Sequence, residues 1–388
     1  MTGRLAISGA RIFDGSAWHE RKSLVIGAGK VKRIVPAGSE PDDARICPAV
    51  GRMIVPGFVD LQVNGGGGVL LNEDPSVDAI RTICAAHAQF GTTALLPTLI
   101  TDTPEVTRRA LSAGRGAAED GVPGFLGLHL EGPHISVARK GAHDPSLIRP
   151  MEEADLDRLV SARPILPVLM TTVAPENTTA DQVAKLARAG LLVSLGHTDT
   201  DYATAVAYAG AGARLATHLF NAMSPLSHRA PGMVGAALQT GALWVGLIAD
   251  GHHVDPAAIA IALRAKMEPG RIFLVTDAMS TVGTSLQSFE LNGRTIYRRE
   301  GRLTLADGTL AGSDIDMIAS VRFMHRSVGV AIEEALRMAA LYPAEAAGIG
   351  DRKGRLSAGF DADFIELSDR LEVEATWIGG TKVHARAA

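Results

Sequence analysis

Residues Phe125–Pro133 read FLGLHLEGP, an apolar segment that ends on a carboxylate and is followed by Gly132-Pro133. Apolar residues on both faces predict a strand buried within a parallel sheet. The Gly-Pro pair ends that strand, because proline cannot donate to a hydrogen-bonded ladder. Glu131 therefore lies at the carboxyl end of a core strand. A charge there is costly unless a positive or protic group meets it.

Three other apolar segments end in the same way. His197 closes LLVSLGH, His218 closes LATH and Asp277 closes IFLVTD. The carboxyl ends of the strands in a (β/α)8 barrel face the active site, and catalytic residues lie there. We therefore expect Glu131 and these three side chains to form one site.

Between residues 58 and 350, apolar segments alternate with helical segments, which predicts a parallel sheet covered by helices. The eight expected strands match a closed (β/α)8 barrel. They are Gly57–Val63, Thr93–Thr98, Phe125–Glu131, Val168–Val173, Leu191–His197, Arg214–His218, Trp244–Ala249 and Ile272–Asp277. An open sheet is the alternative if one strand is miscounted.

Glycines mark the ends of the expected helices, as glycine commonly does after a helical C-terminus. The expected helices are Val77–Phe90, Ala180–Ala189, a helix from Thr200 to Gly210, Ile315–Val328 and Ile332–Ala347. Residues 283–313 read as hairpin strands inserted after the eighth strand. Residues 1–57 and 351–388 have strand-and-turn character, so we expect them to pair as a small β-sandwich beside the barrel.

Composition excludes several classes of protein. The 388 residues are 46% hydrophobic and 21% charged, with a net charge of −4 and no run of lysines or arginines. The charge pattern therefore gives no indication of nucleic-acid binding. Two cysteines make no disulfide framework. No apolar run reaches the ~20 residues of a membrane span, and residues 4–13 lack the apolar core of a signal peptide. We expect a cytoplasmic protein without membrane partners.

Glu131, His197 and His218 are one carboxylate and two imidazoles, a common ligand set for a catalytic zinc that keeps a position open for water. Such a metal lowers the pKa of that water and makes hydroxide available near neutral pH. Asp277 would take the proton of the water and deliver it to the leaving group, as a general acid/base. The alternative is ordinary polar residues at strand ends, which four such residues at one rim disfavour.

Several loop residues carry weaker signals. His143 could polarise a carbonyl, although a solvated loop histidine is equally compatible. Arg229 and His253 would together suit an anionic group such as phosphate, or lie on the surface. His129 would pack or support the site. Gly65–Gly68 lacks the lysine and the spacing of a phosphate-binding loop, so a flexible loop is expected.

The chain resembles the amidohydrolase superfamily in Val55–Asp60 (VPGFVD) and in Gly354–Asp363 (GRLSAGFDAD). More narrowly, it is similar to the family of N-acetylglucosamine-6-phosphate deacetylases. The motifs that carry this similarity are HLEGP, KGAHDP, GHT, THLFNAM, ADGHH and VTDA. They run through the whole chain.

The resemblance implies a metal held by Glu131, His197 and His218, with Asp277 as the acid/base and His143 on the acetamide carbonyl. The family positions that hold the sugar phosphate or close over it match Ala142, Asn221, Ala222, Arg229, His253, Leu310, Ala311 and Gly312. The resemblance also implies a homodimer with a phosphate site shared between subunits. Gln62 and Asn64 stand where many amidohydrolases have a His-x-His pair, so one divalent metal per subunit is expected, zinc first, with iron or another divalent ion as alternatives.

The function that this implies is hydrolysis of the acetamide of N-acetylglucosamine 6-phosphate to glucosamine 6-phosphate and acetate by a metal-bound hydroxide. Another amidohydrolase, acting on a different N-acyl or cyclic amide substrate, is the enzymatic alternative. A catalytically silent scaffold with the same fold is the non-enzymatic one, which the retention of all four rim residues disfavours.

Overall fold

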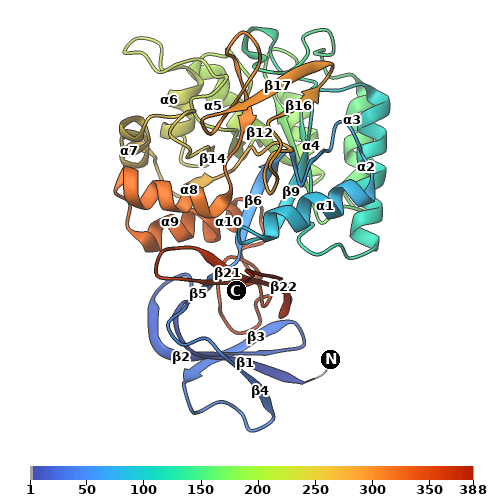
Figure 1. Ribbon diagram of the computed structural model, residues 1–388. Coiled ribbons are helices and arrows are strands. Elements are labelled where there is room, and N and C mark those ends of the chain that lie inside the picture. Colours follow the sequence, from blue (N-terminus) through green and yellow to red (C-terminus); the bar gives the residue numbers. More distant parts are fainter. Residues whose placement is uncertain (1–2, 388) are drawn as a thin grey trace.

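The computed structural model describes residues 3–387, which form a barrel and a separate sheet built from both ends of the chain (Figure 1). Eight parallel strands lie in the order β15-β14-β13-β12-β11-β10-β9-β6. Their bounds are β6 Phe58–Val63, β9 Thr92–Ile100, β10 Gly127–Glu131, β11 Val168–Val173, β12 Leu192–Leu195, β13 Leu215–Ala216, β14 Trp244–Leu247 and β15 Ile272–Leu274. The predicted barrel with an appended sheet is confirmed.

Backbone contacts between the first and last strands close the barrel. Val63 forms a parallel bridge to Ala278, and the carbonyl of Ala278 accepts the Asn64 N–H at 2.9 Å. The Asp277 N–H donates to the carbonyl of Gln62, also at 2.9 Å. Residues 62–64 and 277–278 therefore lie side by side, which brings the end of the first strand to the end of the eighth.

Helices surround the barrel and bury its outer face. They are α1 Val77–Ala88, α2 Pro104–Glu119, α3 Glu153–Ala162, α4 Ala180–Arg188, α5 Tyr202–Gly210, α6 Gly232–Gln239, α7 Pro256–Ala265, α8 Met317–Phe323, α9 Ile332–Ala339 and α10 Leu341–Ala346. Side-chain caps start many of them, as at Ser76, Thr103 and Thr179. No helix within residues 3–387 has both the length and the apolar character to cross a bilayer.

The sheet beyond the barrel joins the two ends of the chain in the order β22-β21-β20-β5-β1-β2-β3, with β4 beside β1. Its strands are β1 Arg4–Phe13, β2 Trp18–Gly27, β3 Lys30–Pro36, β4 Ala44–Pro48, β5 Met53–Pro56, β20 Phe364–Leu367, β21 Val373–Ile378 and β22 Thr381–Ala385. It has a core of its own, in which Phe364 stacks on Trp377 at 5.2 Å between ring centroids. The division of the chain at residues 57 and 350 stays a prediction.

A four-stranded antiparallel insertion follows the eighth strand, at the end of the barrel opposite the terminal sheet (Figure 1). Its strands are β16 Ser288–Leu291, β17 Arg294–Arg299, β18 Arg302–Thr304 and β19 Leu310–Ser313. Leu291, Ile296 and Leu303 pack with Ile100 and Met279 of the barrel into a small apolar cluster. The insertion is thereby fastened over the carboxyl ends of the barrel strands.

The element bounds differ from the sequence expectations in two ways. The fifth, sixth and eighth strands end before His197, His218 and Asp277, because these residues turn out of the strand conformation. The expected helix Ile332–Ala347 is two helices, α9 and α10, since Ala340 between them leaves the helical conformation with φ −125°. The expected helix Ile315–Val328 likewise ends as α8 and continues as a π-helical segment over Met324–Val328.

Candidate active site

The four predicted rim residues meet inside the carboxyl end of the barrel. Glu131 is the last residue of β10, whereas His197, His218 and Asp277 lie just beyond β12, β13 and β15. These three have positive φ angles of 48°, 29° and 53°. A left-handed backbone is uncommon outside glycine, and such strain concentrates at functional sites. At these three residues, the left-handed backbone conformation turns each side chain toward the inside of the barrel at its carboxyl end.

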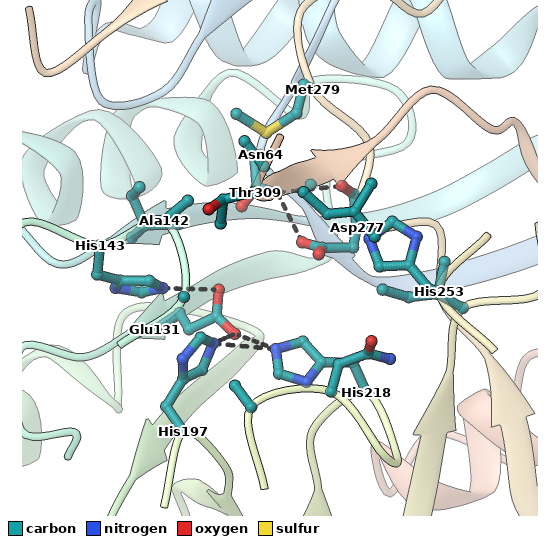
Figure 2. A pocket seen from close by; sticks show the side chains of 18 of the residues that line it. Asn64, Glu131, Ala142, His143, His197, His218, His253, Asp277, Met279 and Thr309 are labelled. Carbon is teal, nitrogen blue, oxygen red and sulfur yellow. Dashed lines mark hydrogen bonds and ion pairs between the residues drawn. The ribbon is translucent and has the colours of Figure 1, made fainter. Parts of the chain in front are cut away.

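Glu131 and two imidazoles form the centre of the site (Figure 2). Glu131 Oε1 lies 3.3 Å from His197 Nε2 and 3.2 Å from His218 Nε2. The two Nε2 atoms are 3.0 Å apart. All three side chains are buried. Burial alone would raise the pKa of Glu131, but its close contacts with the imidazoles of His197 and His218 outweigh that effect and hold the pKa well below its ordinary value.

The backbone orients His197. Its Nδ1–H donates to the carbonyl of Arg139 at 2.8 Å. In the neutral form that binds a metal, an imidazole has one N–H, so the bond to Arg139 leaves the lone pair on Nε2, the nitrogen on the side of Glu131. Metal-binding histidines ordinarily have their second nitrogen held in this way. His197 is therefore oriented as a ligand.

The cluster fits a divalent metal. Ligand atoms about 2.0–2.2 Å from a tetrahedral zinc lie about 3.3–3.5 Å from one another, close to the separations between Glu131, His197 and His218. One carboxylate and two imidazoles are also the donors such an ion prefers. A third imidazole is near, since one ligand atom each of Glu131, His143 and His197 lie within 4.8 Å of one another. The identity of the metal stays a prediction.

His143 lies on the loop after β10, with Nε2 3.8 Å from Glu131 Oε2 (Figure 2). Its Nδ1 meets Thr101, whose hydroxyl oxygen is 2.7 Å away. Burial, together with the nearby His197, lowers the pKa of His143 to about 3. The imidazole is therefore neutral at pH 7 and carries one proton.

Two amides hold Asp277. Asn64 Nδ2 donates to Asp277 Oδ1 at 2.7 Å, and Gln62 Nε2 donates to the same oxygen at 3.1 Å and to Glu131 Oε1 at 2.9 Å. Oδ2 accepts neither of these bonds and is available to a group bound in the pocket. Burial, together with the charge of Glu131, raises the pKa of Asp277 to about 6. A carboxylate with this pKa can accept and return a proton near neutral pH.

A pocket opens above these groups. Every residue predicted for the site lines it except Arg229. The lining consists of Asn64, Ile100, Glu131, Gly141, Ala142, His143, His197, His218, Asn221, Ala222, Ile248, His253, Asp277, Met279, Leu291, Thr309, Leu310, Ala311 and Gly312. Arg229 lies on the exposed loop after Asn221 and outside this set.

His253 is the predicted anion contact that does reach the pocket. Its Nδ1 lies 2.6 Å from Asp250 Oδ2, and both side chains are nearly buried. Burial raises the pKa of Asp250, but the bond to His253 outweighs it and lowers that pKa to about 2. The charged Asp250 therefore favours a proton on Nδ1 of His253 and fixes the ring.

Sequence reasoning missed several parts of the site. In the sequence, Gln62 and Asn64 indicate only that a His-x-His pair is missing, because their hydrogen bonds to Asp277 depend on closure of the barrel. Met279, Ile100 and Leu291 form an apolar wall that no motif marked. In the sequence, only their proximity to a strand end or to the insertion indicated that these three residues lie near the site.

Two other histidines are structural. His129 lies inside the barrel, where its nitrogens meet the hydroxyls of Thr98 at 3.2 Å and Thr172 at 2.8 Å. His87 on α1 is buried, and its Nε2 lies 2.9 Å from the carbonyl of Gly65. This contact fixes the glycine-rich loop Gly65–Gly68 against α1.

Comparison with known proteins agrees with this geometry. The model of the amidohydrolase family matches residues 53–383. The chain belongs to the amidohydrolase family. This amidohydrolase is 42% identical over 330 residues to N-acetylgalactosamine-6-phosphate deacetylase from Shewanella sp. (strain ANA-3), covering 84% of this chain and 82% of the relative.

Two solved structures extend the comparison to nearly the whole amidohydrolase. N-acetylglucosamine-6-phosphate deacetylase from Pasteurella multocida superposes with a TM-score of 0.94 at 34% identity, covering 99% of this chain and 100% of the other. A mutant of the Mycobacterium smegmatis enzyme, in complex with N-acetyl-D-glucosamine-6-phosphate, superposes with a TM-score of 0.90 at 31% identity over 98% and 99% of the two chains. The chain thus falls in the branch of the family that holds these deacetylases, as predicted.

Proposed function

We propose that this amidohydrolase is a metal-dependent deacetylase of an N-acetylhexosamine 6-phosphate, with N-acetylglucosamine 6-phosphate as the first candidate. The observation that carries the proposal is the meeting of Glu131, His197 and His218 with an amide-held Asp277 in one pocket. The products are the amino-sugar phosphate and acetate. When bound to Glu131, His197 and His218, a divalent ion supplies a water of lowered pKa and polarises the acetamide carbonyl.

The residues of the chain divide the proton transfers between them. Asp277 Oδ2 takes a proton as water adds to the carbonyl carbon, because Oδ1 is already occupied by the amides of Gln62 and Asn64. His143 donates a hydrogen bond to the carbonyl oxygen as negative charge develops there. Asp277 then returns its proton to the nitrogen, the C–N bond breaks, and the free amine leaves.

The sugar phosphate needs hydrogen-bond donors, and of the two predicted anion contacts, His253 and Arg229, His253 lines the pocket. Arg229 is exposed on the loop Pro225–Ala230, together with Leu226, whose exposed fraction is 57%. We propose that a second copy of the chain packs on this loop and that the protein is a homodimer. In that arrangement, Arg229 of one copy completes the phosphate site of the other.

The direct test measures acetate release from purified protein whose bound metal is quantified in the same sample. N-Acetylglucosamine 6-phosphate and unphosphorylated N-acetylglucosamine are compared. The proposal predicts about one metal per chain and a strong preference for the phosphorylated sugar. Metal without turnover on any N-acetylhexosamine 6-phosphate would contradict it and direct attention to other N-acyl substrates.

N-Acetylgalactosamine 6-phosphate is the second candidate, because the Shewanella relative at 42% identity acts on that sugar by its name. The two sugars differ only in the configuration at C4. A ratio of kcat/KM for the two phosphates, measured with the same preparation, decides between them.

A further inference from the structure

Thr101 is a buried residue at the rim of the barrel, directly after β9, and it meets His143 with two of its groups. Its hydroxyl oxygen lies 2.7 Å from His143 Nδ1. Its backbone N–H also points at Nδ1, with the two nitrogens 3.3 Å apart. No motif in the sequence marks Thr101.

The backbone contact determines where the proton of His143 resides. A hydroxyl can donate or accept, so the Thr101 side chain alone would leave the tautomer of the imidazole open. A backbone N–H can only donate. Nδ1 must therefore be an acceptor, and the single proton of the neutral imidazole is on Nε2. A doubly protonated ring would set two N–H groups against each other and is incompatible with this contact.

The opposite tautomer is present on the neighbouring ring. His197 donates from Nδ1 to the carbonyl of Arg139, so in its neutral, metal-binding form Nε2 is unprotonated and faces Glu131. The rings of His143 and His197 lie 4.5 Å apart between centroids. Distances alone would accept either ring as a metal ligand, because both have a nitrogen near Glu131. The partners of the two Nδ1 atoms distinguish the rings, because the Arg139 carbonyl accepts from His197 whereas the Thr101 N–H donates to His143.

We propose that Thr101 is a positioning residue that keeps the proton of His143 on Nε2, so that His143 faces the pocket as a hydrogen-bond donor and not as a metal ligand. The catalytic consequence rests on the proposed function, in which that donor meets the acetamide carbonyl. The tautomer itself does not depend on the identity of the substrate.

Gly132 makes room for this arrangement. A Cβ built on Gly132 would lie 2.2 Å from the Thr101 hydroxyl oxygen, and Gly132 has a φ of +90°. The Thr101 hydroxyl lies 3.4 Å from the carbonyl of Glu131. The glycine after Glu131 thus allows β9 and β10 to bring Thr101 against His143.

Two variants separate the hydroxyl from the shape of the side chain. Thr101→Val keeps the branched shape and removes the hydroxyl, whereas Thr101→Ser keeps the hydroxyl and removes the methyl group. The backbone donor remains in both. We expect Thr101→Val to keep its bound metal and its KM and to lose kcat by about tenfold, the order of one lost hydrogen bond. Thr101→Ser should stay near the wild-type kcat. A wild-type kcat in Thr101→Val, or an equal loss in both variants, would overturn the role of the hydroxyl.

The tautomer is measured without substrate by NMR of protein labelled with ¹⁵N-histidine, and the His143 signals are identified by their loss in His143→Gln. We expect a protonated Nε2 and an unprotonated Nδ1 in the metal-loaded wild type. We also expect His143→Gln to retain its metal. A protonated Nδ1, or loss of the metal from His143→Gln, would assign the ring as a ligand and overturn the proposal. Since neither readout involves turnover, a failure here is distinguishable from a wrong substrate.

Discussion

At the residue scale, the behaviour of the site depends on where each proton is held. The amides of Gln62 and Asn64 occupy one oxygen of Asp277 and leave the other for chemistry. The backbone groups of Arg139 and Thr101 meet the Nδ1 atoms of His197 and His143 and favour opposite tautomers of the two rings. These contacts give chemically equivalent side chains different tasks.

Replacing Asp277 with asparagine removes the group that moves the proton and preserves the size of the side chain. We expect Asp277→Asn to keep about one metal per chain and to lower kcat by a factor on the order of 10²–10⁴, the usual contribution of a general acid/base. Metal analysis and acetate release measure the two properties. Asp120→Asn, at an exposed aspartate paired with Arg81, is the control and should behave as wild type. A near-normal kcat in Asp277→Asn would remove Asp277 from the mechanism.

The pH profile should report the ionisation of Asp277. Burial and the charge of Glu131 raise its pKa to about 6, whereas an ordinary aspartate titrates near ~3.9. A base must be deprotonated, so activity should be present above this pKa and fall as the pH drops through it. A bound cation moves the midpoint of this fall below 6. Measurement of kcat/KM from pH 4.5 to 8 tests this expectation, and an acidic limb with its midpoint above pH 7 would contradict it.

At the element scale, turns at the strand ends determine where the side chains meet. β10 ends at Glu131 and leads into Gly132, whose φ of +90° and close approach to Thr101 leave no room for a Cβ. The insertion β16–β19 then covers the pocket and contributes part of its wall. Each turn and connection thus has a consequence for the site.

Gly132→Ala should be far more damaging than an alanine at a comparable glycine without neighbours. Gly348 has a φ of +73° and nothing within 4 Å of a built Cβ, so Gly348→Ala should cost about 1 kcal/mol of stability from backbone strain alone. Gly132→Ala adds a clash and should cost about 3 kcal/mol or more. The free energy of unfolding in urea measures both. Equal losses would show that the contact with Thr101 is not restrictive.

The insertion is tied to the loop of His143 by Arg294, whose guanidinium donates to the carbonyl of Ala142. Arg294→Met keeps the length of the side chain and removes that bond. We expect KM to rise by about five- to tenfold, the order of one hydrogen bond, with the metal retained. Arg299→Met, at an exposed arginine on the same strand β17, is the matched control. An unchanged KM in Arg294→Met would show that the bond does not order the pocket.

At the scale of the whole molecule, closure of the barrel and pairing of the chain ends place distant residues together. The proposed dimer adds a second copy of the chain to each phosphate site.

A mixture of Asp277→Asn and Arg229→Ala chains tests the proposed dimer. In a mixed dimer, the Arg229→Ala chain keeps its own Asp277 and receives Arg229 from its partner, so activity should rise above that of either variant alone. Refolding or exchange of the two chains, followed by acetate assay, measures this recovery. No recovery with demonstrated mixed dimers would place Arg229 within its own site.

Much of this molecule could be predicted because strand patterns and strand ends are local features. Apolar segments ending on Glu131, His197, His218 and Asp277 were sufficient to predict a barrel and the composition of its rim. The lengths of the last strands were overestimated, since a positive φ at His197 or Asp277 leaves no trace in apolar periodicity. The resemblance, rather than periodicity, supplied the loop residues such as Ala142 and Leu310 that line the pocket.

The sequence by itself determined the fold class, the donor types and the family. Only the tertiary structure decided which oxygen of Asp277 is free, which ring among His143 and His197 turns a lone pair toward Glu131, and that Arg229 lies outside the pocket of its own chain. The physical reason is range. Apolar periodicity acts over a few residues, whereas these hydrogen bonds join atoms from turns that are far apart along the chain and meet only when the barrel closes.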